Sequence, residues 1–213
     1  MSVAVKICGL KTPEDAHVAI NAGADLLGCV FFEKSPRNVS AVQAAEVFDM
    51  IGDADVLRVG LFVNPSDDEL MAVLNQVRLD LIQLHGTETP ERVEEIRLTF
   101  GLPVMKALAI ADGSDVESAK KYDGVADRLL FDAKPPKGAT RPGGNAIAFD
   151  WSLLTDTTWS VPWMLAGGLS TENVKDALIQ SGAKAVDVSS GVESEPGVKS
   201  PEMIEAFIAF AKA

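Results

Sequence analysis

The sequence predicts a single closed barrel of eight parallel strands and eight helices, the (β/α)8 or TIM barrel, spanning residues 1–213. First, eight short apolar runs rich in branched residues alternate with stretches whose apolar residues recur with helical spacing. Second, the apolar runs are nearly continuous, as in parallel strands that are buried on both faces. Third, almost every connection is short, so the repeating units fill the chain and leave no room for a second domain. An open, doubly wound sheet is the alternative fold.

The expected elements follow one another in a regular order. Strands are expected at the branched apolar runs 3–7, 25–32, 56–63, 79–84, 104–110, 127–131, 162–166 and 185–188. Helices are expected where apolar residues return every three or four positions, at roughly 13–22, 41–52, 66–77, 90–100, 114–121, 150–155, 171–181 and 201–212. The pattern at 150–155 is weak. It follows the Pro/Gly-rich stretch 133–145, a long loop of the kind that is usually functional in a compact domain.

Three of the expected helices begin with the same chemistry. A threonine or serine, a proline and a glutamate stand in succession at 12–14, 89–91 and 200–202. The hydroxyl caps the first turn, the proline loses no hydrogen bond there, and the acid interacts with the positive end of the helix. These triplets therefore mark where a loop ends and a helix begins.

The composition limits the classes of partner. Hydrophobic residues make up 47% of the 213 residues and charged residues 23%, which is typical of a folded chain. The formal net charge is −12, so the basic surface that nucleic acids require is missing and no nucleic-acid partner is expected. An anionic substrate remains compatible, because helix ends and a few basic side chains hold an anion despite the overall charge.

Cysteine and histidine usage gives further exclusions. Cys8 and Cys29 are the two cysteines; they lie in apolar runs without a paired spacing, which predicts a reducing, cytoplasmic environment. The first residues lack a signal-peptide pattern and no apolar run is long enough to span a membrane, so no membrane association is expected. His17 and His85 belong to no metal-binding cluster, and the glycine-rich nucleotide motifs are missing. We therefore expect neither a metal nor a cofactor.

The residues that follow the expected strands are rich in chemistry. In a TIM barrel the active site lies at the carboxyl ends of the strands. There the sequence places a thiol, an arginine, a histidine, two carboxylates and two glycine-rich turns. These residues are Cys8, Arg37, His85, Asp132, Gly167, Gly168, Asp187, Ser189, Ser190 and Gly191. We expect them to face one pocket.

The glycine-rich turns after the last two strands, AGGLS at 166–170 and SSGVE at 189–193, predict a phosphate site. A phosphate requires backbone N–H donors, close approach without a Cβ atom and the positive end of a helix. TIM barrels often bind phosphate at this place. The alternative is that Gly167, Gly168 and Gly191 only permit tight turns.

Cys8 and Asp132 are the candidate acid–base pair. Proton transfer requires two groups on opposite sides of a substrate, and the first and sixth strands lie well apart on an eight-stranded ring. A partly exposed thiol near positive charge becomes a useful base, and desolvation helps a carboxyl group keep its proton. The alternative for Cys8 is an inert core thiol, but its position at a strand end, directly before Gly9, favours the site.

Three polar side chains have alternatives that the sequence leaves open. Lys6 precedes Cys8 by two positions, so both point to the same side of the strand, and Asp187 on the closing strand is its expected partner. Otherwise Lys6 would extend to solvent. Arg37 would clamp a carboxylate or lie solvated in its loop. His85 would line the pocket or have a purely structural role.

Seven motifs, taken together, resemble one known family. They are KICGL at 6–10, FFEKSPRNVS at 31–40, IQLHG at 82–86, LFD at 130–132, PGG…FDW at 142–151, LAGGLSTENV at 165–174 and VDVSSGVESEPGVKS at 186–200. In order and spacing they resemble phosphoribosylanthranilate isomerase of tryptophan biosynthesis, over nearly the whole chain. The resemblance implies a TIM barrel of the ribulose-phosphate-binding type and a cofactor-free Amadori rearrangement of an aminoaldose phosphate to an aminoketose phosphate.

The resemblance also implies residue roles. Asp132 would be the general acid that protonates the furanose oxygen, and Cys8 the general base that removes the C2 proton. Arg37 would hold the anthranilate carboxylate, with His85 and Asp187 among the substrate-binding residues. The phosphate would be held by Gly143, Gly144, Gly167, Gly168, Ser190 and Gly191. Members of this family occur as monomers and homodimers, and both states remain open for this chain.

One departure and two alternatives stand beside this resemblance. The family usually carries GGTG before FDW, whereas this chain has Gly143-Gly144-Asn145-Ala146, which puts the phosphate contribution of that loop in doubt. Another phosphosugar barrel enzyme is one alternative, although it would need a catalytic lysine or a set of metal-binding histidines. The other is a barrel that binds a phosphorylated aromatic ligand without turnover.

Overall fold

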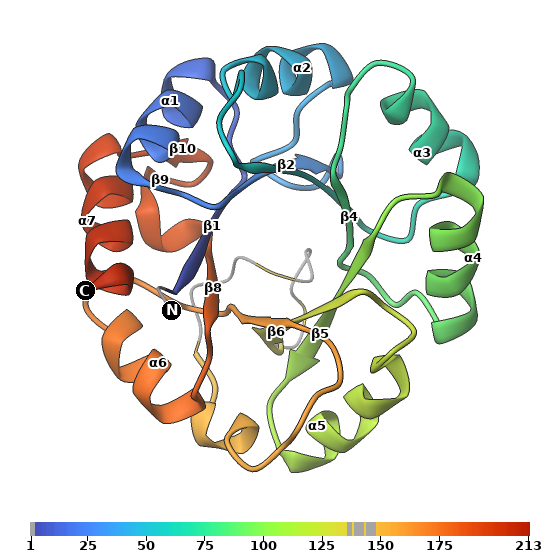
Figure 1. Ribbon diagram of the computed structural model, residues 1–213, viewed down its shortest axis with the longest axis vertical. Coiled ribbons are helices and arrows are strands. Elements are labelled where there is room, and N and C mark those ends of the chain that lie inside the picture. Colours follow the sequence, from blue (N-terminus) through green and yellow to red (C-terminus); the bar gives the residue numbers. More distant parts are fainter. Residues whose placement is uncertain (1–2, 136–137, 139–142, 144–147) are drawn as a thin grey trace.

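Eight parallel strands form a closed barrel in the computed structural model, which describes residues 3–135, 138, 143 and 148–213 (Figure 1). Each strand pairs with the next along the chain, and β8 closes the ring against β1. The strands are β1 Ala4–Cys8, β2 Leu26–Phe31, β3 Leu57–Phe62, β4 Leu81–Leu84, β5 Val104–Ile110, β6 Arg128–Ala133, β7 Trp163–Leu165 and β8 Ala185–Val188. The predicted fold is confirmed.

Helices surround the barrel and connect successive strands (Figure 1). They are α1 Pro13–Ala22, α2 Ala41–Asp49, α3 Asp67–Leu74, α4 Pro90–Phe100, α5 Gly113–Ala119, α6 Val174–Ser181 and α7 Pro201–Lys212, with the short 3₁₀ helices η1 Lys120–Tyr122, η2 Trp151–Leu154 and η3 Ser190–Val192. The weak helical pattern expected near 150–155 forms the 3₁₀ helix η2 rather than an α-helix, and the Asp150 carboxylate accepts a hydrogen bond from the N–H of Ser152 there.

Two other boundaries differ in a way that bears on function. β6 extends to Ala133, because Ala109 and Ile110 of the long β5 pair with Asp132 and Ala133, so Asp132 lies within the strand rather than after it. The helix expected from 171 begins only at Val174, since the side chain of Asn173 accepts from the Ser170 N–H and holds the preceding residues in a turn.

The three shared helix starts are confirmed. The hydroxyls of Thr12, Thr89 and Ser200 accept hydrogen bonds from the backbone N–H three residues later, and a proline follows each of them. Such caps satisfy backbone donors that the first helical turn leaves without a partner. They fix where each loop at the carboxyl end of a strand ends.

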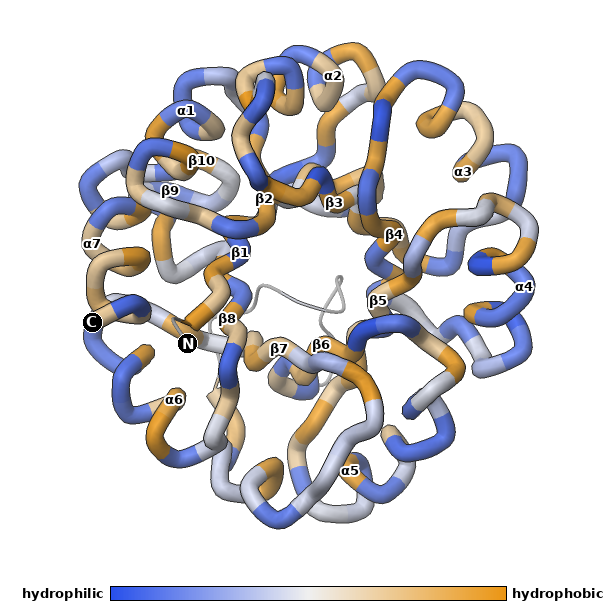
Figure 2. The backbone as a smooth tube through the Cα atoms, in the orientation of Figure 1, coloured by the Kyte–Doolittle hydropathy of each residue, from blue (hydrophilic) through white to orange (hydrophobic). Residues whose placement is uncertain are grey.

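Apolar side chains fill two layers. The larger lies between the strands and the helices, and includes Leu27, Phe131 and Phe207. The smaller fills the barrel interior with Leu26, Val59, Leu81, Met105, Leu130 and Met164, among others. Figure 2 shows apolar colours along much of the strands, while polar and apolar residues alternate along the helices. Because the interior is packed, a ligand has access only at the ends of the barrel.

The loop after β8 contains a hairpin that we did not predict. It consists of β9 Glu193–Glu195 and β10 Val198–Lys199, which pair in antiparallel orientation. It lies between η3 and α7 and brings Glu193 against Arg37, with Lys199 on the same carboxylate. Among the described residues, no helix has the length and apolar character needed to cross a membrane.

Candidate active site

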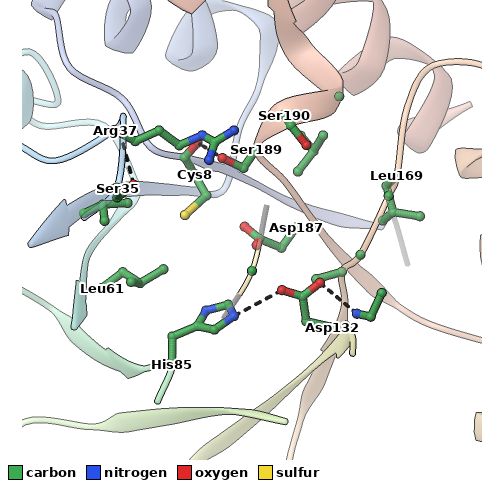
Figure 3. A pocket seen from close by; sticks show the side chains of 18 of the residues that line it. Cys8, Ser35, Arg37, Leu61, His85, Asp132, Leu169, Asp187, Ser189 and Ser190 are labelled. Carbon is green, nitrogen blue, oxygen red and sulfur yellow. Dashed lines mark hydrogen bonds and ion pairs between the residues drawn. The ribbon is translucent and has the colours of Figure 1, made fainter. Parts of the chain in front are cut away.

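A pocket opens at the carboxyl ends of the strands, and its lining includes nearly every residue that the sequence placed there (Figure 3). The predicted residues that line it are Cys8, Arg37, His85, Asp132, Gly143, Gly167, Gly168, Asp187, Ser189, Ser190 and Gly191. Gly144 lies outside the described residues. The expectation that these side chains converge is confirmed.

Cys8 ends β1 with its sulfur facing the pocket, and only 3% of the residue is exposed. Gly28 lies opposite it on β2, where an added Cβ would come within 3.2 Å of the sulfur and 3.1 Å of Lys6 Nζ. Burial raises the pKa of the Cys8 thiol above its ordinary value, and the nearby positive charge of Lys6 opposes that shift. In the free protein the thiol therefore retains its proton at neutral pH.

Lys6 and Asp187 form the predicted ion pair. Lys6 Nζ lies 2.8 Å from Asp187 Oδ1, and the two residues face each other in the β1–β8 register. Burial by itself lowers the Lys6 pKa, but the charge and hydrogen bond of Asp187, together with those of Cys8, more than compensate, and the net pKa is raised. A permanent cation therefore lies beside the thiol, and the alternative of an exposed lysine is wrong.

Asp132 is held on the other side of the pocket (Figure 3). Its Oδ1 accepts a 2.8 Å hydrogen bond from the N–H of Ala133, and its Oδ2 lies 3.1 Å from His85 Nε2. Gly143 packs directly against this pair, since an added Cβ would lie 2.6 Å from Asp132 Oδ2 and 2.7 Å from His85 Nε2. The carboxyl group is therefore fixed in orientation.

His85 both lines the pocket and orients Asp132. Its Nδ1 lies 3.0 Å from Gln83 Nε2. In this orientation the Gln83 amide donates to His85 Nδ1, so the ring proton is assigned to His85 Nε2, which donates to Asp132. We did not predict a role for Gln83. Its signal was present, because a polar residue two positions before His85 in a buried strand points to the same side.

Arg37 is buried, with 4% of its surface exposed, so the alternative of a solvated loop arginine is wrong. Its Nε lies 2.6 Å from Glu193 Oε1 and its Nη2 lies 2.8 Å from Glu193 Oε2. Lys199 Nζ donates a 2.8 Å hydrogen bond to the same carboxylate. Burial raises the Glu193 pKa, but Arg37, Lys199 and the N–H of Gly197 outweigh it and bring the pKa to about 2.

The two glycine-rich turns approach each other closely. Gly167 and Gly168 have φ values of 86° and 63°, a region that other residues rarely adopt. A Cβ on Gly167 would lie 2.5 Å from the backbone nitrogen of Ala133, and one on Gly191 would collide with the carbonyl oxygen of Leu169. The backbone geometry requires these glycines with or without a ligand.

Fold and site together define a TIM-barrel enzyme whose pocket carries a thiol and a carboxyl group at the ends of its strands. The chain belongs to the N-(5'-phosphoribosyl)anthranilate (PRA) isomerase family, whose family model matches residues 5–209. The N-(5'-phosphoribosyl)anthranilate isomerase of Paramagnetospirillum magneticum is 59% identical over 212 residues, covering 100% of this chain and 98% of the relative. That of Rhodospirillum rubrum is 55% identical over 207 residues, 96% of this chain and 95% of the relative.

Solved structures agree with this membership. The phosphoribosyl anthranilate isomerase of Thermotoga maritima superposes with a TM-score of 0.87 at 37% identity, covering 99% of this chain and 98% of that one. A phosphoribosyl anthranilate isomerase in complex with reduced 1-(o-carboxyphenylamino)-1-deoxyribulose 5-phosphate gives a TM-score of 0.84 at 36% identity, with the same coverage. A further Thermotoga maritima structure, at 37% identity, shows monomers generated from a dimeric enzyme.

Proposed function

We propose that this chain is the N-(5'-phosphoribosyl)anthranilate isomerase of tryptophan biosynthesis and that Cys8 and Asp132 transfer its protons. The family membership supports the reaction. The product is the aminoketose 1-(2-carboxyphenylamino)-1-deoxyribulose 5-phosphate. The observation that carries the residue roles is that the thiol and the carboxyl group lie on opposite sides of one pocket (Figure 3).

Asp132 acts first, as the general acid. Its proton passes to the furanose ring oxygen, the C1–O bond breaks, and the lone pair of the anthranilate nitrogen forms the C=N bond of a protonated Schiff base. The hydrogen bonds from Ala133 and His85 support this role, because they keep the carboxyl group turned toward the pocket. A fixed proton donor needs little reorganisation when the ring opens.

Cys8 acts second, as the general base. Its thiolate removes the proton from C2. The electrons of the C2–H bond form a C1=C2 bond while the C=N electrons return to the positively charged nitrogen, which gives an enolamine that tautomerises to the ketone. The Lys6–Asp187 pair supports this role, because the charged lysine stabilises the thiolate beside it.

The remaining lining residues bind the two charged ends of the substrate. The N–H groups around Gly167, Gly168, Ser190 and Gly191 would receive the phosphate, since both turns face the pocket without Cβ atoms in the way. Gly143 borders the acid from the loop before η2, and Asp187 lies in the floor of the same pocket. Arg37 would hold the anthranilate carboxylate. The chemistry needs neither metal nor cofactor.

The free cysteines and the lining of the pocket bear on compartment and assembly. We place the enzyme in the cytoplasm, an assignment supported by the free thiols of Cys8 and Cys29. A monomer and a homodimer are both compatible with a site whose lining comes from one chain.

A turnover assay on freshly generated phosphoribosylanthranilate, followed by the loss of its fluorescence, tests the acid–base pair. Wild type should consume the substrate rapidly, whereas Cys8→Ser and Asp132→Asn should each lose at least about 100-fold in kcat. Cys29→Ala is the matched control, since Cys29 is a buried thiol whose sulfur packs against the Leu10 carbonyl outside the site.

The outcomes separate the reaction from the residue roles. Loss of fluorescence no faster than spontaneous hydrolysis in the wild type would overturn the isomerase assignment. Full activity of Cys8→Ser or Asp132→Asn would leave the reaction in place and remove that residue from the mechanism.

A further inference from the structure

The guanidinium of Arg37 has two edges that can hold a carboxylate, and the protein occupies one of them. Glu193 accepts from Nε and Nη2, which form the side edge. The end edge, formed by Nη1 and the second N–H of Nη2, has no acceptor within the part of the chain that the structure describes. Arg37 lines the pocket, whereas Glu193 lies behind it, outside the lining.

The charges around Arg37 sum to a net cation. The Glu193 carboxylate would by itself neutralise Arg37 and repel a second carboxylate brought to the other edge. Lys199 compensates, because its Nζ lies 2.8 Å from Glu193 Oε1. Burial lowers the Lys199 pKa, and the charge and hydrogen bond of Glu193 oppose that shift and favour the charged lysine. The buried trio of Arg37, Glu193 and Lys199 therefore carries one positive charge toward the pocket.

The trio is also held rigidly by the backbone. The N–H of Gly197 donates a 3.0 Å hydrogen bond to Glu193, and Lys199 donates a 2.8 Å hydrogen bond to the carbonyl of Ser189. The hairpin packs on the arginine loop so closely that a Cβ on Gly197 would lie 2.5 Å from the Pro36 carbonyl oxygen. Glu193 thus cannot follow Arg37 if the guanidinium rotates.

We propose that Glu193, supported by Lys199, is a positioning residue that determines specificity: it fixes Arg37 so that the end edge of the guanidinium meets the ring carboxylate of the substrate. The inference rests on the proposed function, which supplies that carboxylate. Glu193 acts through Arg37 and does not contact the substrate. The negative charge of Glu193 repels the carboxylate of the ligand. This repulsion is offset because Glu193 fixes the direction of the two N–H donors that Arg37 presents to the ligand.

Two ligands that differ only in the carboxylate isolate this role. One is reduced 1-(o-carboxyphenylamino)-1-deoxyribulose 5-phosphate, and the other is its phenylamino counterpart without the carboxyl group. The dissociation constants of both are measured by calorimetry for wild type, for Glu193→Gln and for Glu195→Gln. Glu195 is exposed on the same strand, β9, and is the matched control.

The sign of the change decides between positioning and charge. Glu193→Gln makes the trio more positive, so a purely electrostatic effect would tighten the carboxylated ligand. Positioning instead predicts that this ligand binds about tenfold more weakly, while the ligand without a carboxyl group changes less than twofold. Glu195→Gln should bind both ligands as the wild type does.

Two results would overturn the inference. Equal weakening of both ligands would mean that Glu193 has only a structural role, and tighter binding of the carboxylated ligand would mean that its charge outweighs its geometry. A wild type that binds neither ligand would refute the proposed function instead. Arg37→Lys provides a second variant, because a lysine offers no planar pair of donors: it should lose the preference for the carboxylated ligand with Glu193 intact.

Discussion

At Cys8, burial and the neighbouring charges shift the pKa of the thiol in opposite directions. Burial raises the pKa of the thiol, and the positive charge of Lys6 lowers it; Asp187, which keeps Lys6 charged, raises it again. In the proposed mechanism the thiolate is the base, so the rate at a given pH should follow the fraction of Cys8 that is deprotonated. If Cys8 is the base, the charge of Lys6 beside it therefore sets the pH range in which the enzyme is active.

Lys6→Met should move the pH–rate profile to higher pH. Removal of the cation raises the Cys8 pKa further. As a result, kcat/KM at neutral pH should fall about tenfold or more and recover as the pH rises. A pH–rate profile from about pH 6 to about pH 10 measures this change. Lys6→Met also leaves Asp187 buried and unpaired, so the variant Lys6→Met/Asp187→Asn serves as the control. Its pH–rate profile should lie between the profiles of the wild type and of Lys6→Met. An unchanged alkaline limb would exclude Lys6 from the activation of Cys8.

Some of these contacts could be predicted from the sequence and others could not. Lys6, Cys8 and Asp187 follow from alternation along a strand and from closure of the ring, which require no side-chain detail. The partnership of Arg37 with Glu193 spans 156 positions and depends on a hairpin that apolar periodicity does not reveal. The partner of a buried charge in a loop depends on the path of the loops in three dimensions. Loop residues show little periodicity, so the sequence does not predict such a pair.

At the scale of elements, the loop between β4 and α4 illustrates how a buried charge organises backbone. The Glu88 carboxylate accepts hydrogen bonds from the N–H groups of Asn64 and Gly86, and Lys106 Nζ lies 2.9 Å from it. Lys106 also donates to the carbonyls of Leu84, Gly86 and Ala107. This loop begins with His85, so the Glu88–Lys106 pair indirectly fixes the partner of Asp132. Neither residue was singled out from the sequence.

Glu88→Ala should destabilise the protein by about 3–5 kcal/mol at pH 7, because it leaves Lys106 as an unpaired buried cation. Burial already lowers the Lys106 pKa, and loss of the Glu88 charge would lower it more. A lysine whose folded pKa lies below its unfolded value favours the folded state increasingly as pH rises between those two values. Urea unfolding should therefore show the variant regaining stability between pH 7 and pH 10.

Glu94→Ala is the matched control for that experiment, since Glu94 is exposed on α4. It should change stability by less than about 0.5 kcal/mol at either pH. A Glu88→Ala deficit that stayed constant with pH would show that the lost backbone hydrogen bonds, and not the unpaired lysine, account for the destabilisation.

At the scale of the whole molecule, neighbouring strands of the barrel pair over different lengths. β5 and β6 share a register from Met105↔Arg128 to Ile110↔Ala133, whereas β7 and β8 share a single pair, Leu165↔Val186. β7 is also the shortest strand of the barrel, from Trp163 to Leu165. The two loops proposed to bind phosphate follow these two strands directly, so the weakest pairing of the ring lies beneath the expected phosphate site.

Hydrogen exchange should therefore be fastest where the ring is weakest. In the free protein, amides of β7 and β8 should exchange through local openings of lower free energy than those of β5 and β6. Reduced 1-(o-carboxyphenylamino)-1-deoxyribulose 5-phosphate should slow β7 and β8 most, because one phosphate bonded to both loops joins the two strands, and a dephosphorylated counterpart should not. Native-state exchange read residue by residue checks both statements. Equal protection of Leu165 and Leu108 in the free protein would show that the helices packed outside the ring, rather than the strand pairs, determine where the barrel opens.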